Sequence, residues 1–250
     1  LKEVIMLKKY TKFDYLNIFL IIASFFAIYF IILGNGNVFY GSTMDYANQH
    51  YMIPEYFRTL FYETKDFIPS FAFNLGMGQN IFNFSYYGLF NPLILISYLL
   101  PFVKMASYLS FVSVLIVILD AFLFYYFISK KTEDRKIRFI STFLFVMASP
   151  LILHSHRHVM FVNYMPFLIL GLIGVENYVC KNEKVLLMLS ILFVVTTSYF
   201  FSIPALIVMV LYGMFLYLKS NTKFVFKDFV CYFLKFAIYF IIPIMIAGIL

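Results

Sequence analysis

The chain has 250 residues, of which 63% are hydrophobic and only 12% are charged. A soluble domain carries roughly 25% charged residues, so this composition excludes an ordinary soluble protein and predicts one that has the bilayer as its solvent. The 19 Lys and Arg residues outnumber the 12 Asp and Glu residues. This excess does not by itself indicate a nucleic-acid partner, because in a membrane protein Lys and Arg concentrate in the loops on the cytoplasmic side.

The first apolar run covers residues 15–33 and follows the basic residues Lys2, Lys8, Lys9 and Lys12. At about 19 residues the run is long enough to span a membrane, and the lysines predict a cytoplasmic N-terminus. The run exceeds the apolar core of a signal peptide, which is about 7 to 15 residues, and no cleavage site follows it. We therefore expect a retained first span.

A polar segment, residues 34–104, follows and is expected to form one large external loop. Within it, aromatic residues recur every three or four positions over residues 51–67 with charged residues between them, which predicts a helix lying on the membrane surface. Gly76 and Gly78 predict a tight turn. Residues 91–102 are apolar but too short to span, and we interpret them as an interfacial or re-entrant piece.

The remaining apolar runs predict six further spans. Dense basic clusters at 130–138, 181–184 and 219–227 are expected to face the cytoplasm, so the chain crosses an even number of times between them. The tips of the two resulting hairpins, near 154–158 and 196–202, then share the external side with the loop.

The fold class expected for residues 1–250 is therefore a single, all-α, polytopic membrane module. It has about seven spans, or eight if residues 91–102 also cross. The last span reaches the final residue, so we expect the N-terminal part of a longer protein. The seven spans are 15–33, 105–129, 139–153, 160–179, 185–199, 202–218 and 229–250.

Two groups of polar residues should meet on the external side: the loop acids with Arg58, and the tip HSHRH at 154–158. A carboxylate can remove a proton from an acceptor hydroxyl while cationic side chains neutralise a phosphate leaving group. This combination predicts a lipid-phosphate substrate.

Each of these features also has a simpler interpretation, and the sequence does not decide between them. Asp45 could cap the turn that follows GSTM, and Arg58 could extend to a lipid phosphate without a catalytic role. The histidine tip is compatible with a solvated turn, a phosphate contact or a metal site. Tyr86 and Tyr87 could belong to the aromatic belt of the interface or stack on a sugar.

Several short motifs together resemble those of the YfhO family of bacterial membrane proteins, and they run through almost the whole chain. Besides Arg58, the motifs are GSTMDYANQHY, FNLGMGQNIFNFSYYGLFNPL, HRHVMFVNYMPFLILGLIGVE and TTSYFFSIPAL. That family is similar to the C-type (GT-C) glycosyltransferases, whose shared module has seven helices and an active site on the external face.

The resemblance implies an inverting glycosyltransferase of the hexosyltransferase type in the bacterial cell membrane. The donor would be a polyprenyl-phosphate sugar, and the acceptor a cell-envelope polymer such as teichoic or lipoteichoic acid. Asp45 would be the catalytic base. The donor phosphate would be bound by Arg58, His156, Arg157 and His158. Substrate contacts would come from Gln49, His50, Tyr86, Tyr87 and Asn163.

Many C-type enzymes hold a metal with further acids in the second external loop, whereas the corresponding tip here is basic. We therefore assign no metal ligands and no cofactor. Two other functions stay open: a transporter or flippase for a lipid-linked or anionic substrate, for which Asp120 inside a span is the supporting residue, and a structural subunit without chemistry.

Overall fold

A computed structural model describes residues 10–33, 45–67, 69–220 and 225–249, with the backbone alone for His156 and Ile249. Helices form nearly all of it. In chain order the α-helices are α1 (Lys12–Leu33), α2 (Met52–Thr64), α3 (Pro92–Ile96), α4 (Met105–Ser129), α5 (Arg135–Val146), α6 (Ser149–Arg157), α7 (Met165–Lys181), α8 (Val185–Thr197), α9 (Tyr199–Ser220) and α10 (Phe226–Ile249).

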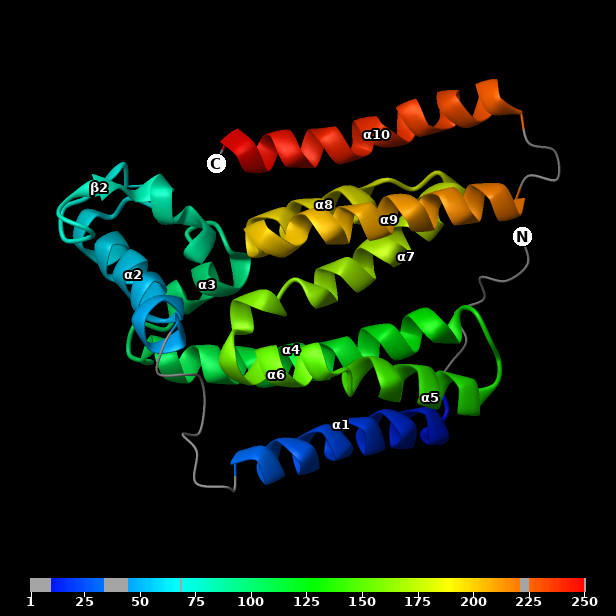
Figure 1. The fold of residues 1–250 in the computed structure, drawn as a ribbon, viewed down its shortest axis with the longest axis horizontal. Coiled ribbons are helices and arrows are strands. Elements are labelled where there is room, and N and C mark those ends of the chain that lie inside the picture. The colour runs from blue at the N-terminus through cyan, green and yellow to red at the C-terminus, as the bar shows by residue number, and fades with distance from the viewer. Residues whose placement is uncertain (1–9, 34–44, 68, 221–224, 250) are drawn as a thin grey trace.

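The long helices lie side by side along the longest axis of the molecule (Figure 1). One end, here called the loop end, carries α2, α3 and the strands, together with the connections from α6 to α7 and from α8 to α9. The other end carries the connections from α4 to α5 and from α7 to α8, the end of α9 and the start of α10. The helix ends nearest the basic clusters thus share one end of the bundle, as the charge pattern predicted.

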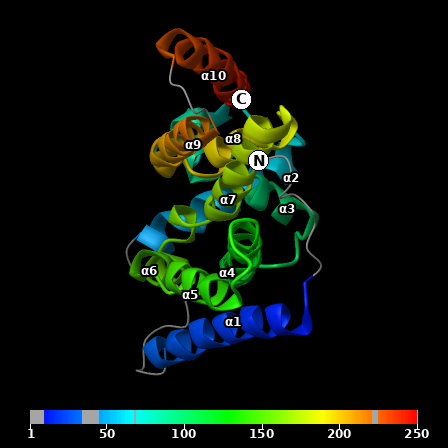
Figure 2. The ribbon, with the colours of Figure 1, turned by 90° about the vertical axis from the view of Figure 1, so that its right-hand side faces the viewer.

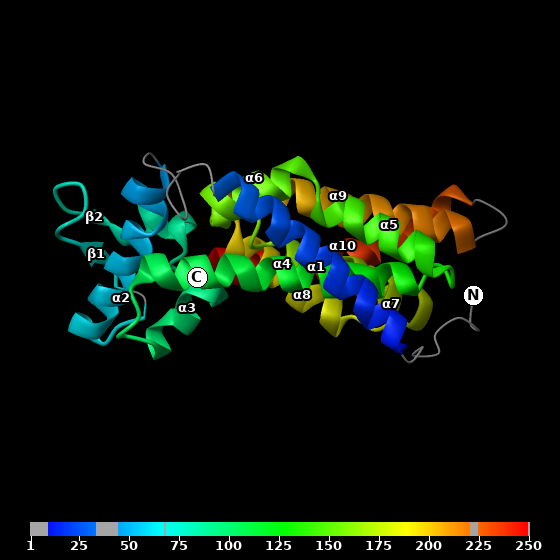
Figure 3. The same ribbon diagram turned by 90° about the horizontal axis from the view of Figure 1, so that it is seen from below.

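Helices α1 and α10 form the two outer edges of the bundle, and α7 lies in its middle (Figure 2). Helix α7 packs against α4, α8 and α9. Helix α1 crosses α4 and α5 obliquely (Figure 3) and contacts both. The all-α, polytopic fold class expected from the sequence is confirmed.

Five helices in the described ranges are long and apolar enough to span a membrane. The expected segments 139–153 and 185–199 differ from the other spans. The first is a bent pair, α5 and α6, with a 50° break. The second is α8, which has 13 residues and is about 20 Å long at 1.5 Å per residue. The structure therefore gives five spanning-length helices, or six with the bent pair, where the sequence predicted about seven.

The break between α5 and α6 has a local cause. Pro150 lies in the first turn of α6 and has no N–H to donate to the carbonyl of Val146, so a continuous helix would lose a hydrogen bond and meet a steric clash there. The chain bends at Met147 and Ala148 and restarts with proline near the N-terminus of a helix, a position that tolerates it.

The loop contains the predicted surface helix, α2, which buries Ile53, Phe57 and Leu60 on one face. This is the spacing of an amphipathic helix. The strands β1 (Phe71–Ala72) and β2 (Gln79–Asn80) pair antiparallel, with Phe71 opposite Asn80. The turn between them places Gly76 and Gly78 at positive φ, a conformation that glycine adopts without strain.

Residues 91–102 do not cross the bundle. They form the five-residue α3 and one turn of 3-10 helix, Ser97–Leu99. The side-chain amide of Asn91 donates to the carbonyl of Thr197 at the end of α8, at 3.3 Å. This short segment therefore holds the loop against the end of α8.

Helices α7 and α8 are in close contact at Gly174, so a methyl group added at this residue should lower the stability of the protein. A Cβ at Gly174 would lie 2.7 Å from the backbone nitrogen of Leu187. Because backbone cannot move aside like a side chain, we expect Gly174→Ala to destabilise the protein by about 1–3 kcal/mol, measured by thermal unfolding in detergent. Gly248→Ala is the matched control, since the described residues leave open space at that Cβ position. An equal loss in both variants would contradict the proposed close packing.

Candidate functional site

A pocket of about 490 Å³ lies at the loop end, where three separate parts of the chain meet. Its lining comes from the loop, from the connection after α6 and from the start of α9. The lining residues are Asp45, Gln49, His50, Tyr86, Tyr87, Met160, Phe161, Ser198, Tyr199 and Phe200. Five of the residues predicted from the sequence, which lie up to 42 positions apart, therefore surround one space.

Asp45 precedes a π-helical turn, Tyr46–His50, and its side chain makes no capping hydrogen bond within the described part of the chain. Its Oδ2 atom lies 3.6 Å from Nε2 of His158, and its side chain is 57% exposed. The capping interpretation is therefore not supported, and the carboxylate is open to the pocket. π-Helical turns occur frequently at functional sites.

His50 is buried beside this pair, with only 4% of its surface exposed. Its ring lies 5.3 Å from that of His158 and 6.2 Å from that of Tyr87, centroid to centroid. Burial and, to a smaller extent, the nearby His158 together lower the pKa of His50 to about 4, against the opposite effect of Asp45. His50 is therefore a neutral imidazole at physiological pH, which suits hydrogen bonding to an uncharged part of a substrate.

This lowered pKa predicts how stability depends on pH. Unfolded histidine has a pKa of about 6.5, so between pH 6.5 and 4 the unfolded chain binds a proton that folded His50 does not. Stability should therefore fall as the pH decreases through this window, by about 2–3 kcal/mol from this group. Thermal unfolding at several pH values should show a smaller decline in His50→Gln. An unchanged decline would contradict the prediction.

Two tyrosines of the loop form an aromatic wall. The rings of Tyr86 and Tyr87 lie 4.3 Å apart, and Tyr86 faces Tyr199 at 6.5 Å. The Tyr87 hydroxyl donates to Oε1 of Gln49 at 2.5 Å, which fixes both side chains. Burial raises the pKa of Tyr87 to about 12, so the hydroxyl stays protonated and acts as a donor.

A second cavity, of about 250 Å³, lies on the other side of this wall. It shares Tyr86 and Tyr199 with the first and is otherwise lined by α8, α10 and the loop, including Phe90, Val195 and Ile244. The two cavities differ in their ionisable groups: the first is lined by Asp45 and His50, whereas the described lining of the second has no Asp, Glu, His, Lys or Arg.

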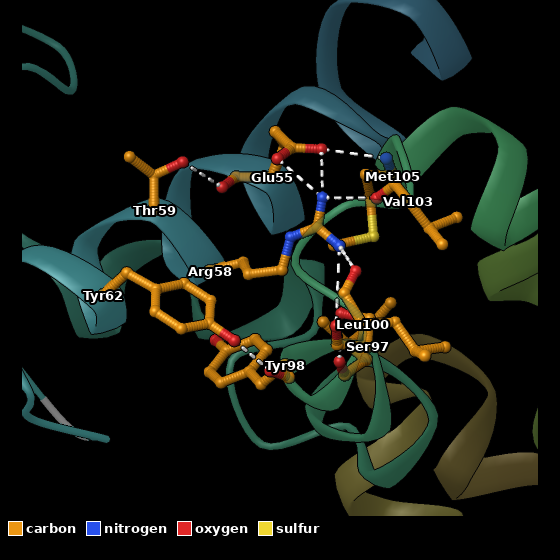
Figure 4. A network of polar contacts seen from close by, with 10 residues as sticks. Glu55, Arg58, Thr59, Tyr62, Ser97, Tyr98, Leu100, Val103 and Met105 are labelled. Carbon is orange, nitrogen blue, oxygen red and sulfur yellow. Dashed lines mark hydrogen bonds and ion pairs between the residues drawn. The ribbon is translucent and has the colours of Figure 1, made fainter.

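Arg58 takes no part in lining either cavity. Its guanidinium donates to both carboxylate oxygens of Glu55, at 2.8 and 2.9 Å, and to the backbone carbonyls of Val103 at 2.8 Å and Leu100 at 3.2 Å. Oε2 of Glu55 in turn accepts the backbone N–H of Met105 at 2.9 Å. Figure 4 shows this network joining α2 to the start of α4. In this arrangement Arg58 holds α2 against the start of α4, and its predicted contact with the donor phosphate stays a prediction.

The other residues predicted to contact the phosphate or the substrate lie in different surroundings. His158 faces Asp45 but does not itself line the pocket, and Arg157 is exposed and also outside the lining. Asn163 is buried, also outside the lining, and its Oδ1 atom has no hydrogen-bond partner among the described residues. The side chain of His156 lies outside the described residues.

Sequence reasoning missed one wall of the pocket. Ser198, Tyr199 and Phe200 start α9 and line the pocket, although no site role was assigned to them. The signal was present, because the predicted second tip, near 196–202, is the short polar and aromatic interruption between two apolar runs. Met160 and Phe161 carry no comparable signal, since they belong to the start of the apolar run predicted as the span 160–179.

No metal ligands can be assigned from the structure. Among the described residues, no group of three His, Cys, Asp or Glu side chains lies close enough together to hold a metal ion. His154 and His158 have ring centroids 5.6 Å apart and both face Phe161, so aromatic contacts organise this tip.

Fold and pocket together define a polytopic helical membrane protein with a polar and aromatic site at one end of its bundle. The chain belongs to the YfhO family of bacterial membrane proteins, whose family model matches residues 17–250. Neither a curated protein nor a solved structure matches it.

Proposed function

We propose that this protein is a membrane glycosyltransferase that moves a sugar from a polyprenyl-phosphate donor to a cell-envelope polymer, such as teichoic or lipoteichoic acid, on the external face. The observation that carries the proposal is the meeting of Asp45 and His158, 3.6 Å apart, beside a pocket of about 490 Å³. Pockets for small ligands typically measure about 300–1,000 Å³, so a sugar and its phosphate fit this volume.

In the proposed reaction, the Asp45 carboxylate takes the proton of an acceptor hydroxyl as that oxygen bonds to the anomeric carbon. The bond from this carbon to the phosphate oxygen breaks, and the polyprenyl phosphate leaves with the electron pair. The His158 imidazole, by donating a hydrogen bond, stabilises the negative charge that develops on the phosphate. A single displacement of this kind inverts the anomeric centre.

The walls of the pocket support a sugar and a lipid as the two parts of the donor. Tyr86, Tyr87 and Tyr199 offer aromatic faces and hydroxyls, a combination that suits a ligand with both apolar and polar surface. The apolar residues of the adjoining cavity, Phe90, Val195 and Ile244, would contact the first isoprene units.

The test is sugar transfer in membranes that contain the full-length protein, supplied with radiolabelled polyprenyl-phosphate sugars and, in parallel, radiolabelled nucleotide sugars. We expect transfer to envelope polymer from the lipid-linked donor alone. Equal transfer from nucleotide sugars, or no transfer from any lipid-linked donor, would contradict the proposal.

A transporter or flippase is the second candidate, favoured by Asp120, a buried acid within α4. This candidate is less well supported than the glycosyltransferase, because Asp120 does not line the 490 Å³ pocket. Movement of a labelled polyprenyl-phosphate sugar across the membrane of vesicles that contain the protein, without sugar transfer, would favour this candidate over the glycosyltransferase.

A further inference from the structure

Asp120 lies deep inside α4, far from both ends of the helix. It follows Met105 by fifteen residues and precedes Ser129 by nine, which at 1.5 Å per residue places it about 22 Å and 13 Å from the two ends. Its side chain is 2% exposed. Within the described residues, its Oδ1 atom has no hydrogen-bond partner. An ionisable group at this depth is costly and usually functional.

The Asp120 carboxyl faces a small cavity of about 10 Å³. This is close to the minimum volume that holds one water molecule, about 10–15 Å³, and it excludes any organic ligand. Ser155 supplies a second polar side chain, whose hydroxyl donates to the carbonyl of Ile152. The remaining lining is aliphatic: Ile116, Val117, Val146, Leu151 and Val162.

The cavity also lies at the break between α5 and α6. Val146 ends α5, and Leu151 lies in the first turn of α6, so the two residues flank the bend and both line the cavity. Pro150 cannot donate to the carbonyl of Val146. Non-helical backbone at membrane depth is tolerated where it is buried in protein or lines a water-filled cavity. The buried acid and the interrupted helix therefore share one small space.

We propose that Asp120 is a proton-binding site that stays protonated at neutral pH and hydrogen-bonds one water molecule in this cavity. A carboxylate would need a cation, yet no charged side chain other than Asp120 is among the described residues of the lining. Tyr164 lies near enough to interact with Asp120 electrostatically, and a tyrosine supplies no cation in either of its protonation states. A neutral carboxyl supplies a donor and an acceptor, and a buried water needs about two to four polar partners.

Infrared spectroscopy of the full-length protein in lipid nanodiscs tests the protonation directly. We expect a C=O stretching band of a protonated carboxyl at neutral pH, shifted by deuterium exchange and lost in Asp120→Asn. Asp120→Glu should keep the band at a changed frequency. No such band in the wild type, or a band that survives in Asp120→Asn, would overturn the proposal.

Glu176→Gln is the matched control because Glu176 is also a buried acid of a spanning helix, 5% exposed. Unlike Asp120, it is paired with two cations, Lys130 at 3.0 Å and Lys131. We therefore expect Glu176 to be ionised and the protonated-carboxyl band to survive in Glu176→Gln. Loss of the band in this variant would assign it to the wrong residue and overturn the proposal.

A second measurement separates a proton from a bound sodium ion. We expect the thermal unfolding midpoint of the wild type to be the same in sodium chloride and in choline chloride at equal ionic strength. Stabilisation by sodium that disappears in Asp120→Asn would mean that the carboxylate is charged and holds the cation. The protonation of Asp120 within α4 does not depend on the proposed glycosyl transfer.

Discussion

Replacement of Asp45 by asparagine is expected to lower sugar transfer by at least about 100-fold, because general base catalysis typically contributes 10² to 10⁴-fold. The amide has nearly the same shape as the carboxylate but cannot take a proton from the acceptor hydroxyl. Asp45 packs little of its surface against the protein, since its side chain is 57% exposed. Its replacement should therefore leave expression and thermal stability close to those of the wild type.

The matched control is Glu63→Gln, which removes an exposed acid of the same loop that is not among the described residues of the pocket lining. Transfer should be measured in membranes with equal protein levels, using the lipid-linked donor. Full activity of Asp45→Asn would exclude Asp45 as the base, whereas equal losses in both variants would point to a general effect of loop charge.

Replacement of Arg58 by alanine is expected to cost about 1.5–3 kcal/mol of stability, the contribution of hydrogen bonds to a charged group, because its partner Glu55 is 38% exposed and the ion pair is only partly buried. Arg58 is 3% exposed, and its removal strips donors from the carbonyls of Leu100 and Val103 as well as from Glu55. Because these acceptors lie between α3 and α4, we expect the loop to detach from α4. Thermal unfolding in detergent measures the loss.

Arg157→Ala serves as the control for Arg58→Ala because it removes an arginine that is exposed on α6. Surface substitutions of this kind usually change stability by less than about 0.5 kcal/mol. If Arg58→Ala kept the wild-type midpoint but weakened binding of a polyprenyl phosphate, the guanidinium would contact substrate and the structural role assigned to it would be wrong.

The pairing of Asp45 with the histidine tip could be anticipated because it follows from polarity and charge. Polar residues interrupt an otherwise apolar chain at few places, and the positions of the basic clusters decide which interruptions share a side. This reasoning places the first loop, the tip near His158 and the tip near Ser198 together. The resemblance to the YfhO family, carried by the same segments, is confirmed by the family match.

The role of Arg58 could not be anticipated for a physical reason. Two of its principal acceptors are backbone carbonyls, those of Leu100 and Val103, and every residue type supplies such a carbonyl. A guanidinium on an amphipathic helix gives the same sequence signal whether it faces lipid phosphate, substrate or backbone. Pro150 in the sequence could have predicted the bend, but the length of the apolar run, taken alone, predicts one straight span over α5 and α6.

The shortness of α8 has a consequence for where the pocket meets the lipid. At about 20 Å, α8 is only two thirds as long as the thickness of a hydrocarbon core, about 30 Å. Asn91 of the loop contacts the end of α8 by donating to the carbonyl of Thr197. When Val185 lies at one boundary of the core, Thr197 lies about 10 Å inside the other. Hydrophobic mismatch of this kind thins a bilayer locally, so we expect lipid headgroups beside Ser198 to lie closer to the level of Asp45 than around the longer helices.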